Sequence, residues 1–273
     1  MTDAAGPQVE LLLVAHGERR QAAANRGLLA HAAQIATQWP HTFVEAAVLN
    51  GEPSLEQALT VAAGRKLRCL LVYPFFMSDG YIVKQILHQH LRGRAPTKTS
   101  LMRPLGLDPC LPSLLLKESL RAAHAAGFVP SRTQLLVAGH GSRLAREPAA
   151  SVAHIADSLR DRGIFAAVRP AYLEEQPLLR NELKNERPPI VVAGFFSGEG
   201  VHAWRDVPAA IREAGGEAAY TGPIGAHPEI VSLIMNAVVA ELATLRRGGN
   251  GSALGHGCHE GTQLRPWERE PHG

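Results

Sequence analysis

The stretch LLVAGHG at residues 135–141 repeats, 124 positions later, the stretch LLLVAHG at residues 11–17. A short apolar run that ends in His-Gly is typical of a buried parallel strand followed by a loop. Three further pairs of segments keep the same order at offsets of 124, 120 and 119: LNGEPSL (49–55) with LEEQPLL (173–179), FFMSDGYI (75–82) with FFSGEGVH (195–202), and PLGLDP (104–109) with PIGAHP (223–228). Four colinear matches indicate that one structural unit is written twice.

Each copy alternates apolar runs with amphipathic stretches, which predicts βαβ units and a parallel sheet. Strands are expected at residues 9–15, 43–49, 67–76 and 101–105, and in the second copy at 134–139, 166–173, 190–196 and 218–221. Helices are expected at residues 145–162, 207–214 and 228–246. The predicted fold class is α/β, with two homologous doubly wound parallel-sheet lobes and a cleft between them.

The repeat also predicts the organisation of the chain. A first lobe is expected over residues 1–129 and a second over residues 130–247. The last segment, 248–273, is rich in glycine and polar residues and has no periodicity, so it is expected to be a disordered tail. This tail contains Cys258 between His256 and His259, which could capture a metal ion, but such residues also occur in tails without a function, and we favour that interpretation.

Composition excludes several other classes of protein. The 273 residues are 45% apolar, enough for proper cores, and no run of eighteen apolar residues predicts a membrane span. The N-terminus lacks the layout of a secretory signal, so a cytoplasmic protein without membrane contact is expected. The three cysteines are far apart and predict neither disulfides nor a cysteine zinc site. A net charge of +3 gives no reason to expect a nucleic-acid partner.

Three histidines and one glutamate follow predicted strands. Parallel sheets bind ligands beyond the carboxyl ends of their strands, and His16, His140 and His202 all fall there. Glu174 ends the intervening strand of the second copy. Any one of these histidines could be an ordinary hydrogen-bonded loop residue, but three at matching places favour a site. Two imidazoles and a carboxylate suit an open site for a borderline divalent metal, and a neutral imidazole can also accept a proton.

These motifs resemble those of the class II tetrapyrrole chelatases, in particular the CbiX-type sirohydrochlorin chelatases and their duplicated long forms. The resemblance spans roughly residues 9–245. It implies that His140, His202 and Glu174 hold the metal and remove pyrrole protons, and that His16 matches the first histidine of the N-terminal lobe. The implied activity is that of a lyase that inserts a divalent metal, Co²⁺ first, Fe²⁺ next and Ni²⁺ also possible, into sirohydrochlorin for cobalamin or sirohaem biosynthesis.

The implied substrate is a small tetrapyrrole that carries many carboxylates, so guanidinium donors are expected near the site. Arg143, Arg205 and Ser142 are the candidate substrate-binding residues. Each arginine alone is more often a solvated surface charge. The expected assembly is a monomer or a homodimer.

The N-terminal lobe departs from the family pattern. Ile82 stands at the position of His202, and Asn50 stands at that of Glu174. One remaining polar group cannot hold a metal by itself, so this lobe is expected to carry a degenerate site. His16 is then either a secondary ligand or proton acceptor, or part of a relic scaffold, and the sequence leaves both open.

Parts of the sequence fit two rival functions. The segment AHGER at residues 15–19 resembles the core of the histidine phosphatases, but Ala15 and Gly139 stand where the arginine before the histidine would clamp the phosphoryl group. A non-catalytic metal- or tetrapyrrole-binding protein of the same fold is the other alternative. Retention of all three polar groups in the second copy argues against it, and an activity assay would separate the two.

Overall fold

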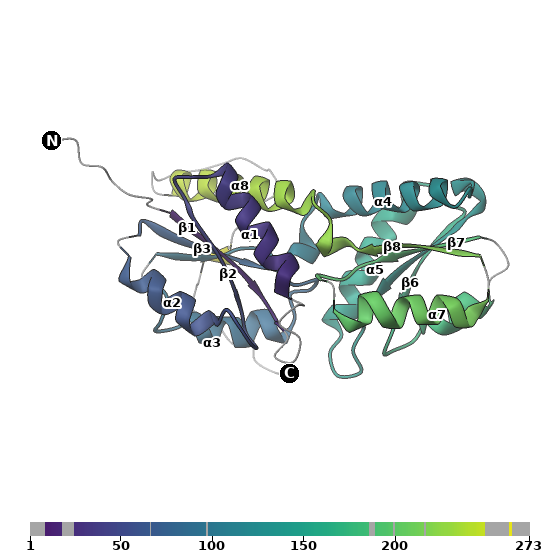
Figure 1. The fold of residues 1–273 in the computed structure, drawn as a ribbon, viewed down its shortest axis with the longest axis horizontal. Coiled ribbons are helices and arrows are strands. Elements are labelled where there is room, and N and C mark those ends of the chain that lie inside the picture. Colours follow the sequence, from purple (N-terminus) through teal and green to yellow (C-terminus); the bar gives the residue numbers. More distant parts are fainter. Residues whose placement is uncertain are drawn as a thin grey trace, which may run out of the picture.

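Two sheets of mainly parallel strands lie end to end along the long axis of the molecule (Figure 1). The computed structural model describes residues 9–17, 25–65, 67–96, 98–185, 189–198, 200–215, 217–248 and 262–263. The parallel strands of the first sheet have the order β2-β1-β3-β4, with β1 (Val9–Ala15), β2 (Phe43–Val48), β3 (Cys69–Pro74) and β4 (Thr99–Leu101). The second has the order β6-β5-β7-β8, with β5 (Gln134–Gly139), β6 (Ala167–Tyr172), β7 (Ile190–Gly194) and β8 (Ala218–Pro223). The predicted pair of homologous α/β sheets is therefore confirmed.

Helices connect the strands and cover both faces of each sheet. In the first half they are α1 (Arg26–Gln38), α2 (Leu55–Gly64), α3 (His88–Leu91) and α4 (Leu111–Ala125). In the second half they are α5 (Glu147–Arg160), α6 (Leu179–Asn185), α7 (Val207–Ala214) and α8 (Ile230–Gly248). Short turns of π-helix, η2 (Ile82–Leu87) and η5 (His202–Asp206), and of 3-10 helix, η3 (Leu105–Leu107), η4 (Pro130–Arg132) and η6 (Ile224–Ala226), complete the chain.

Burial explains why the central strands read as continuous apolar runs. Residues 11–14 of β1 and 135–138 of β5 are all fully buried. Each strand pairs on both sides, β1 with β2 and β3, and β5 with β6 and β7. Helices α2 and α3 pack on one face of the first sheet, and α6 and α7 on one face of the second. With both faces covered, the side chains of residues 11–14 and 135–138 all lie in a core.

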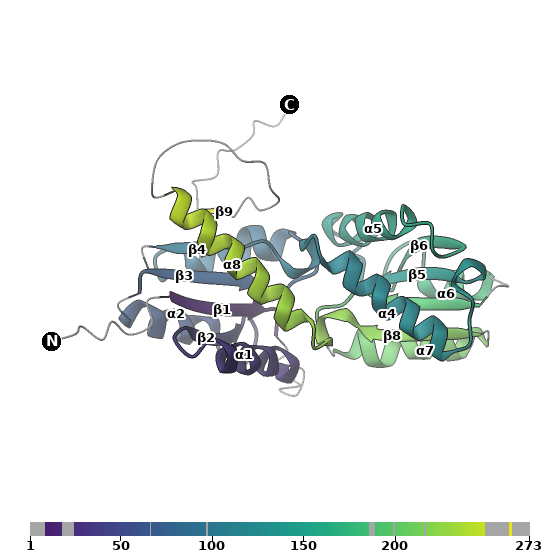
Figure 2. The ribbon, with the colours of Figure 1, turned by 90° about the horizontal axis from the view of Figure 1, so that it is seen from above.

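The last helix of each half lies on the other half. Helix α4, which ends the first half in sequence, packs on β7 and β8 of the second sheet. Helix α8, which ends the second half, runs beside α1 over the first sheet (Figure 2). One continuous cluster of buried side chains consequently extends from the first sheet through these helices into the second. In space, each sheet is completed by a helix from the opposite half of the sequence.

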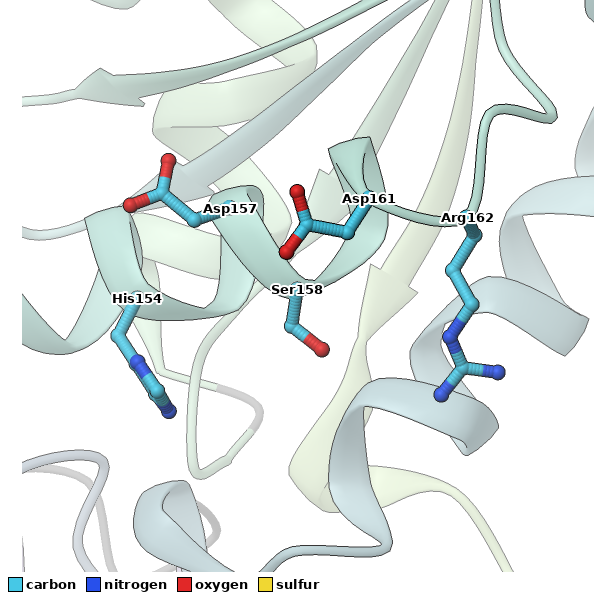
Figure 3. Close-up of a pocket in the computed structure, with 5 residues that line it drawn as sticks. All are labelled: His154, Asp157, Ser158, Asp161 and Arg162. Carbon is cyan, nitrogen blue, oxygen red and sulfur yellow. The ribbon is translucent and has the colours of Figure 1, made fainter.

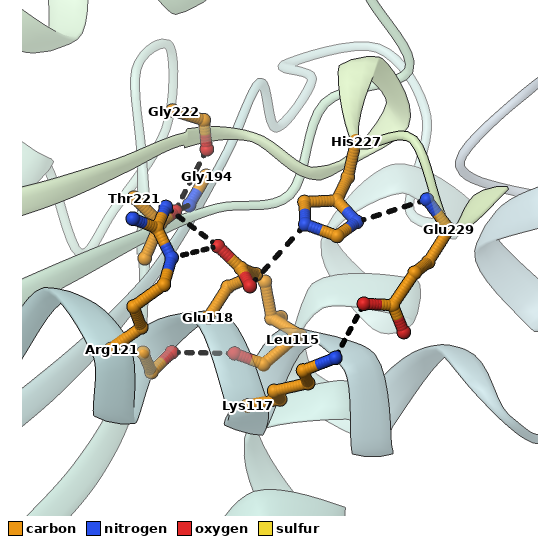
Figure 4. A network of polar contacts seen from close by, with 10 residues as sticks. Leu115, Lys117, Glu118, Arg121, Gly194, Thr221, Gly222, His227 and Glu229 are labelled. Atoms are coloured by element: carbon orange, nitrogen blue, oxygen red, sulfur yellow. Dashed lines mark hydrogen bonds and ion pairs between the residues drawn. The ribbon is translucent and has the colours of Figure 1, made fainter.

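A polar network fixes the place where the two exchanged helices pass (Figure 4). The buried carboxylate of Glu118, on α4, accepts a hydrogen bond of 2.8 Å from Nε of Arg121 and lies 3.3 Å from Nε2 of His227. The backbone N–H of Glu229 donates to Nδ1 of His227 over 3.2 Å, so Nε2 carries the proton toward Glu118. Lys117 and Glu229 form an ion pair next to it.

Ser100 and Glu241 anchor α8 to β4 of the first sheet. The hydroxyl of Ser100 donates to Oε1 of Glu241 over 2.6 Å, and both side chains are buried. Ser100→Ala is expected to lower the free energy of unfolding by roughly 1–3 kcal/mol, because a buried carboxylate loses its hydrogen-bond donor. Urea denaturation followed by circular dichroism measures this. Ser113→Ala, at an exposed site on α4, is the control, and an equal loss in both variants would contradict the anchoring role.

One strand differs from the sequence prediction, while the disorder of the tail and the division of the chain into two lobes stay predictions. The strand expected at 101–105 ends at Leu101, because Pro104 has no N–H to donate and a 3-10 turn begins after it. The tail predicted to be disordered lies outside the described residues, apart from Thr262–Gln263, which form a short strand, β9, antiparallel to β4. The division at residue 129 stays a prediction. Among the described helices, none has both the length and the apolarity to cross a bilayer.

Candidate functional site

The carboxyl ends of β5 and β6 bring His140 and Glu174 together. The N–H of Glu174 donates to the carbonyl of His140 over 3.1 Å, which continues the pairing of the two strands past their ends. Gly141 then turns the chain with φ +71°, and a side chain there would overlap Glu175 and Tyr172. Only glycine adopts this backbone cheaply, which accounts for the His-Gly motif at the end of the strand.

His202 reaches the same place from the other side of β5. It begins the π-turn η5, which follows β7, and its ring meets that of His140 edge to face, with centroids 4.4 Å apart and planes at 90°. Oε2 of Glu174 lies 3.7 Å from Nδ1 of His140. All three side chains are about half exposed, so they remain open to solvent and to a ligand. The structure thus places the three candidate residues of the second half in one group.

Hydrogen bonds define the tautomers of both imidazoles. Nδ1 of His140 lies 3.0 Å from the carbonyl of Gly141, and Nδ1 of His202 lies 2.8 Å from Oδ2 of Asp206. Both partners are acceptors, so in the neutral rings each Nδ1 donates and each Nε2 keeps its lone pair. A free Nε2 lone pair is what a ring needs in order to bind a metal or to accept a proton.

Asp206 is a member of this group that the sequence reasoning missed. Its second oxygen, Oδ1, accepts a hydrogen bond of 3.2 Å from Nε of Arg205. Partial burial raises the pKa of the Asp206 carboxyl, but the hydrogen bonds from Arg205 and His202 outweigh it and hold the pKa below its ordinary value. Asp206 is therefore ionised at neutral pH. The signal for it was visible as a histidine and an aspartate four residues apart on one short helix.

The loop after His140 carries the other two substrate-binding candidates. Nε of Arg143 donates to the carbonyl of Glu174 over 3.0 Å, which ties the loop to the end of β6. The N–H of Ser142 donates to Oε1 of Glu175 over 2.6 Å. The hydroxyl of Ser142 accepts hydrogen bonds from the N–H groups of Leu144 and Ala145. Both residues shape the loop here, and their contact with a substrate stays a prediction. Glu175 was not predicted.

The first lobe holds a reduced counterpart of the group. Nδ2 of Asn50 donates to Nε2 of His16 over 3.3 Å, at the position that Glu174 and His140 occupy in the second lobe. Ile82 begins η2, the π-turn that corresponds to η5. Within the described contacts, His16 pairs with Asn50 and is not brought to His140 or His202.

Several contacts join the two lobes at the carboxyl ends of their strands. A methyl group on Gly80, which follows β3, would lie 3.6 Å from Cβ of Glu147, the first residue of α5. Nε2 of His31 donates to the carbonyl of Gly225, in η6, over 2.9 Å. Two exposed apolar side chains lie a few residues after the histidines along the chain: Trp204 after His202, and Leu144 after His140. The segments that follow the strands of both sheets therefore meet.

In the described part of the chain, no three His, Cys, Asp or Glu side chains stand close enough together to enclose a metal ion. The group around His140 is consequently an open pair of imidazoles with a carboxylate on the Nδ1 side of one ring. Closed four-ligand coordination is typical of structural metal sites, whereas open coordination is typical of sites where chemistry occurs.

A hollow of about 510 Å³ lies elsewhere, on the outer surface of α5 (Figure 3). It is lined by His154, Asp157, Ser158, Asp161 and Arg162. These residues occupy the second half of α5 and the turn after it, whereas the loop of His140 precedes the first residue of that helix. Asp157 already pairs with Arg160, and Arg162 donates to Ser113. The hollow is thus separate from the histidine group.

Comparison with known proteins gives matches over most of the chain. A solved structure described as CbiX, the terminal enzyme for biosynthesis of siroheme in denitrifying bacteria, is 29% identical, with a TM-score of 0.73 over 85% of this chain and 98% of that one. SirB from Bacillus subtilis with Fe³⁺ is 18% identical, with a TM-score of 0.72 over 88% of this chain and 98% of that one, which is a likeness of fold. A probable sirohydrochlorin cobaltochelatase from Halobacterium salinarum is 22% identical over 222 residues, 72% of this chain and 75% of the relative.

The CbiX family model matches the chain twice, over residues 10–122 and 134–241. The two matches correspond to the two halves of the internal repeat and together cover most of the described residues. The chain therefore belongs to the CbiX family, in a duplicated form.

Proposed function

We propose that this protein inserts a divalent metal ion into sirohydrochlorin, and that His140, His202 and Glu174 form the site. The observation that carries the proposal is the contact between the rings of His140 and His202, next to the carboxylate of Glu174, in a member of the CbiX family. The names of the relatives, a sirohydrochlorin cobaltochelatase and an enzyme of siroheme biosynthesis, support the substrate.

Metal insertion replaces two pyrrole N–H protons by one M²⁺ ion, so two protons must leave the ring. An imidazole with a free Nε2 lone pair can accept such a proton, and positioned general bases typically contribute about 10²–10⁴-fold to a rate. The hydrogen bonds on Nδ1 leave that lone pair free in both His140 and His202. Glu174 adds a negative charge beside His140, which stabilises the imidazolium once it has taken a proton.

The same nitrogens can hold the metal before it is transferred. Imidazole binds first-row divalent ions at about 2.0–2.1 Å, and two such bonds to one ion need more space than the edge-to-face contact of His140 and His202 leaves. We infer that the arriving ion separates the two rings. Two imidazoles without a closed cage hold the ion loosely enough to pass it on to the macrocycle.

We propose Co²⁺ as the first candidate metal and Fe²⁺ as the second, with Ni²⁺ also possible. The relative from Halobacterium salinarum is named a cobaltochelatase, and the SirB structure contains iron. Histidine sites bind all of these ions in the usual affinity order, so cellular supply contributes to the choice.

The test is anaerobic incubation of the purified full-length protein with sirohydrochlorin and Co²⁺, Fe²⁺ or Ni²⁺ in turn, with the absorbance change of the tetrapyrrole followed over time. The expected result is insertion faster than the spontaneous reaction for at least one ion. Tight binding of sirohydrochlorin without acceleration for any of the three ions would overturn the proposal and favour a tetrapyrrole-binding protein.

Arg205 is expected to bind a substrate carboxylate. Its Nε is engaged by Asp206, while the guanidinium is largely exposed, and among the described residues its other donors have no partner. Arg205→Gln should raise KM for sirohydrochlorin by roughly 10-fold, as expected for the loss of a charge-assisted hydrogen bond, with a smaller change in kcat. Arg212→Gln, an exposed arginine of α7, is the matched control. An unchanged KM in Arg205→Gln would remove this residue from the substrate site.

A further inference from the structure

The contact between His202 and Asp206 carries an inference beyond the site described so far. Oδ2 of Asp206 lies 2.8 Å from Nδ1 of His202, within the range of a charge-assisted hydrogen bond. The two residues are the first and last of η5, where the N–H of Val207 bonds back to the carbonyl of His202. This π-turn holds both side chains on one side of the helix. Single π-turns occur often at functional sites.

The carboxylate of Asp206 is itself held in place. Its other oxygen accepts the Nε–H of Arg205 over 3.2 Å, so both oxygens are engaged and the group cannot rotate freely. The contacts form a line from Arg205 through Asp206 to Nδ1 of His202. A histidine that binds a metal commonly donates its second N–H to a carboxylate in this way, which sets its tautomer and its orientation.

The first lobe provides an internal comparison. At the offset of 120 that aligns His202 with Ile82, Asp206 aligns with Ile86 (206 − 120 = 86). The first-lobe turn keeps its π-helical backbone, yet both polar residues are isoleucine there. If Asp206 served only the backbone of the turn, the loss of the histidine would give no reason for the loss of the aspartate. Instead, the histidine and the aspartate are both present in the second lobe and both absent from the first.

We propose that Asp206 is a positioning residue that holds His202 as the Nδ1–H tautomer, with the Nε2 lone pair free for the metal or for a pyrrole proton. The inference rests on the proposed function of His202. The competing interpretation is an exposed ion pair of residues four apart on a helix, which would contribute little to stability and nothing to the reaction.

The tautomer of His202 can be measured without substrate or metal. Long-range ¹H–¹⁵N spectra of protein labelled with ¹⁵N-histidine distinguish a protonated from an unprotonated ring nitrogen, and His202→Ala identifies the signals of this residue. We expect a protonated Nδ1 in the wild-type protein and a shift toward the Nε2–H form in Asp206→Ala. Asp206→Glu, which keeps a carboxylate, should restore part of the Nδ1–H form.

The same variants are then compared in binding and turnover. Asp206→Ala should weaken Co²⁺ binding, measured by titration of the protein alone, and lower kcat by roughly 10–100-fold, with KM for sirohydrochlorin and the unfolding midpoint close to those of the wild type. Asp157→Ala, which removes an aspartate from a surface pair with Arg160 on α5, is the matched control and should change neither Co²⁺ binding nor kcat.

Two outcomes would overturn the proposal: an unchanged tautomer of His202 in Asp206→Ala, or unchanged Co²⁺ binding and kcat. If the wild-type protein inserts no metal at all, the proposed function fails, while the tautomer and the Co²⁺ titration still decide whether Asp206 positions His202. The two failures are therefore distinguishable.

Discussion

Replacing either His140 or His202 by alanine is expected to slow metal insertion into sirohydrochlorin by about 100-fold or more. Each ring offers a free Nε2, and the two rings touch, so loss of one removes both a proton acceptor and half of the pair that would hold the ion. The double variant should be little slower than either single variant, because residues that act as one unit do not contribute additively. Initial rates with Co²⁺ and Fe²⁺ measure the effect.

His154→Ala is the control for this experiment, because His154 is an exposed histidine of α5 away from the group. His16→Ala distinguishes the two roles that the sequence left open for the first lobe. A clear loss of rate would make His16 a secondary ligand or proton acceptor, whereas a wild-type rate would make it relic scaffold. Full activity in both His140→Ala and His202→Ala would eliminate the proposed site.

Gly225→Ala is expected to destabilise the protein by about 3 kcal/mol, the upper part of the range for overpacking. A methyl group on Gly225 would lie 2.2 Å from the carbonyl oxygen of Ser197 and 2.5 Å from its carbon. These are backbone atoms, which cannot rotate away as a side chain would. The N–H of Gly225 also bonds to the carbonyl of Phe196 over 2.9 Å, so relief of the overlap stretches this bond. For a chain of this size the expected fall in Tm is roughly 10 °C.

Gly198→Ala is the matched control, because a methyl group on Gly198 meets no atom of the described residues within 4 Å. Gly198 belongs to the turn that leads to η5 and Gly225 contacts that turn, but only Gly225 is packed against backbone atoms. Thermal unfolding of the two variants should therefore differ clearly. Equal Tm values would mean that the turn moves aside at little cost. The first lobe repeats the contact between Gly106 and Met77, so Gly106→Ala should behave like Gly225→Ala.

Most of the fold could be predicted because its signals are local. Apolar runs of five or six residues marked the central strands, and β1 and β5 have the predicted bounds. The exchange of α4 and α8 could not be predicted, because an amphipathic helix shows which of its faces is apolar but not which sheet receives that face. All the sheet faces that these helices could cover are similarly apolar. The choice depends on the path of the chain in space.

The candidate site was predicted to a similar extent. His140 and Glu174 end neighbouring parallel strands, and topology alone brings such residues together. His202 could be predicted because it follows the strand expected at residues 190–196, at the same edge of the sheet. Asp206 did not, because a histidine and an aspartate four residues apart on a helix look like any solvated surface pair. Only the position of η5 relative to β5 and β7 distinguishes this pair from a surface pair.

The exchange of α4 and α8 also determines when each sheet can be completed during translation. The last parallel strand of the first sheet ends at Leu101, but the helix that covers its open face is complete only at Gly248, 147 residues later (248 − 101 = 147). At about 5–20 residues per second, translation of that interval takes roughly 7–30 s. During this interval the nascent first sheet exposes the apolar face that α8 later covers. Helix α4 has no sheet to pack on until β7 and β8 have been synthesised. The first half therefore cannot finish folding on the ribosome before α8 has emerged, whereas the helix that covers the second sheet, α4, is synthesised before the strands of that sheet.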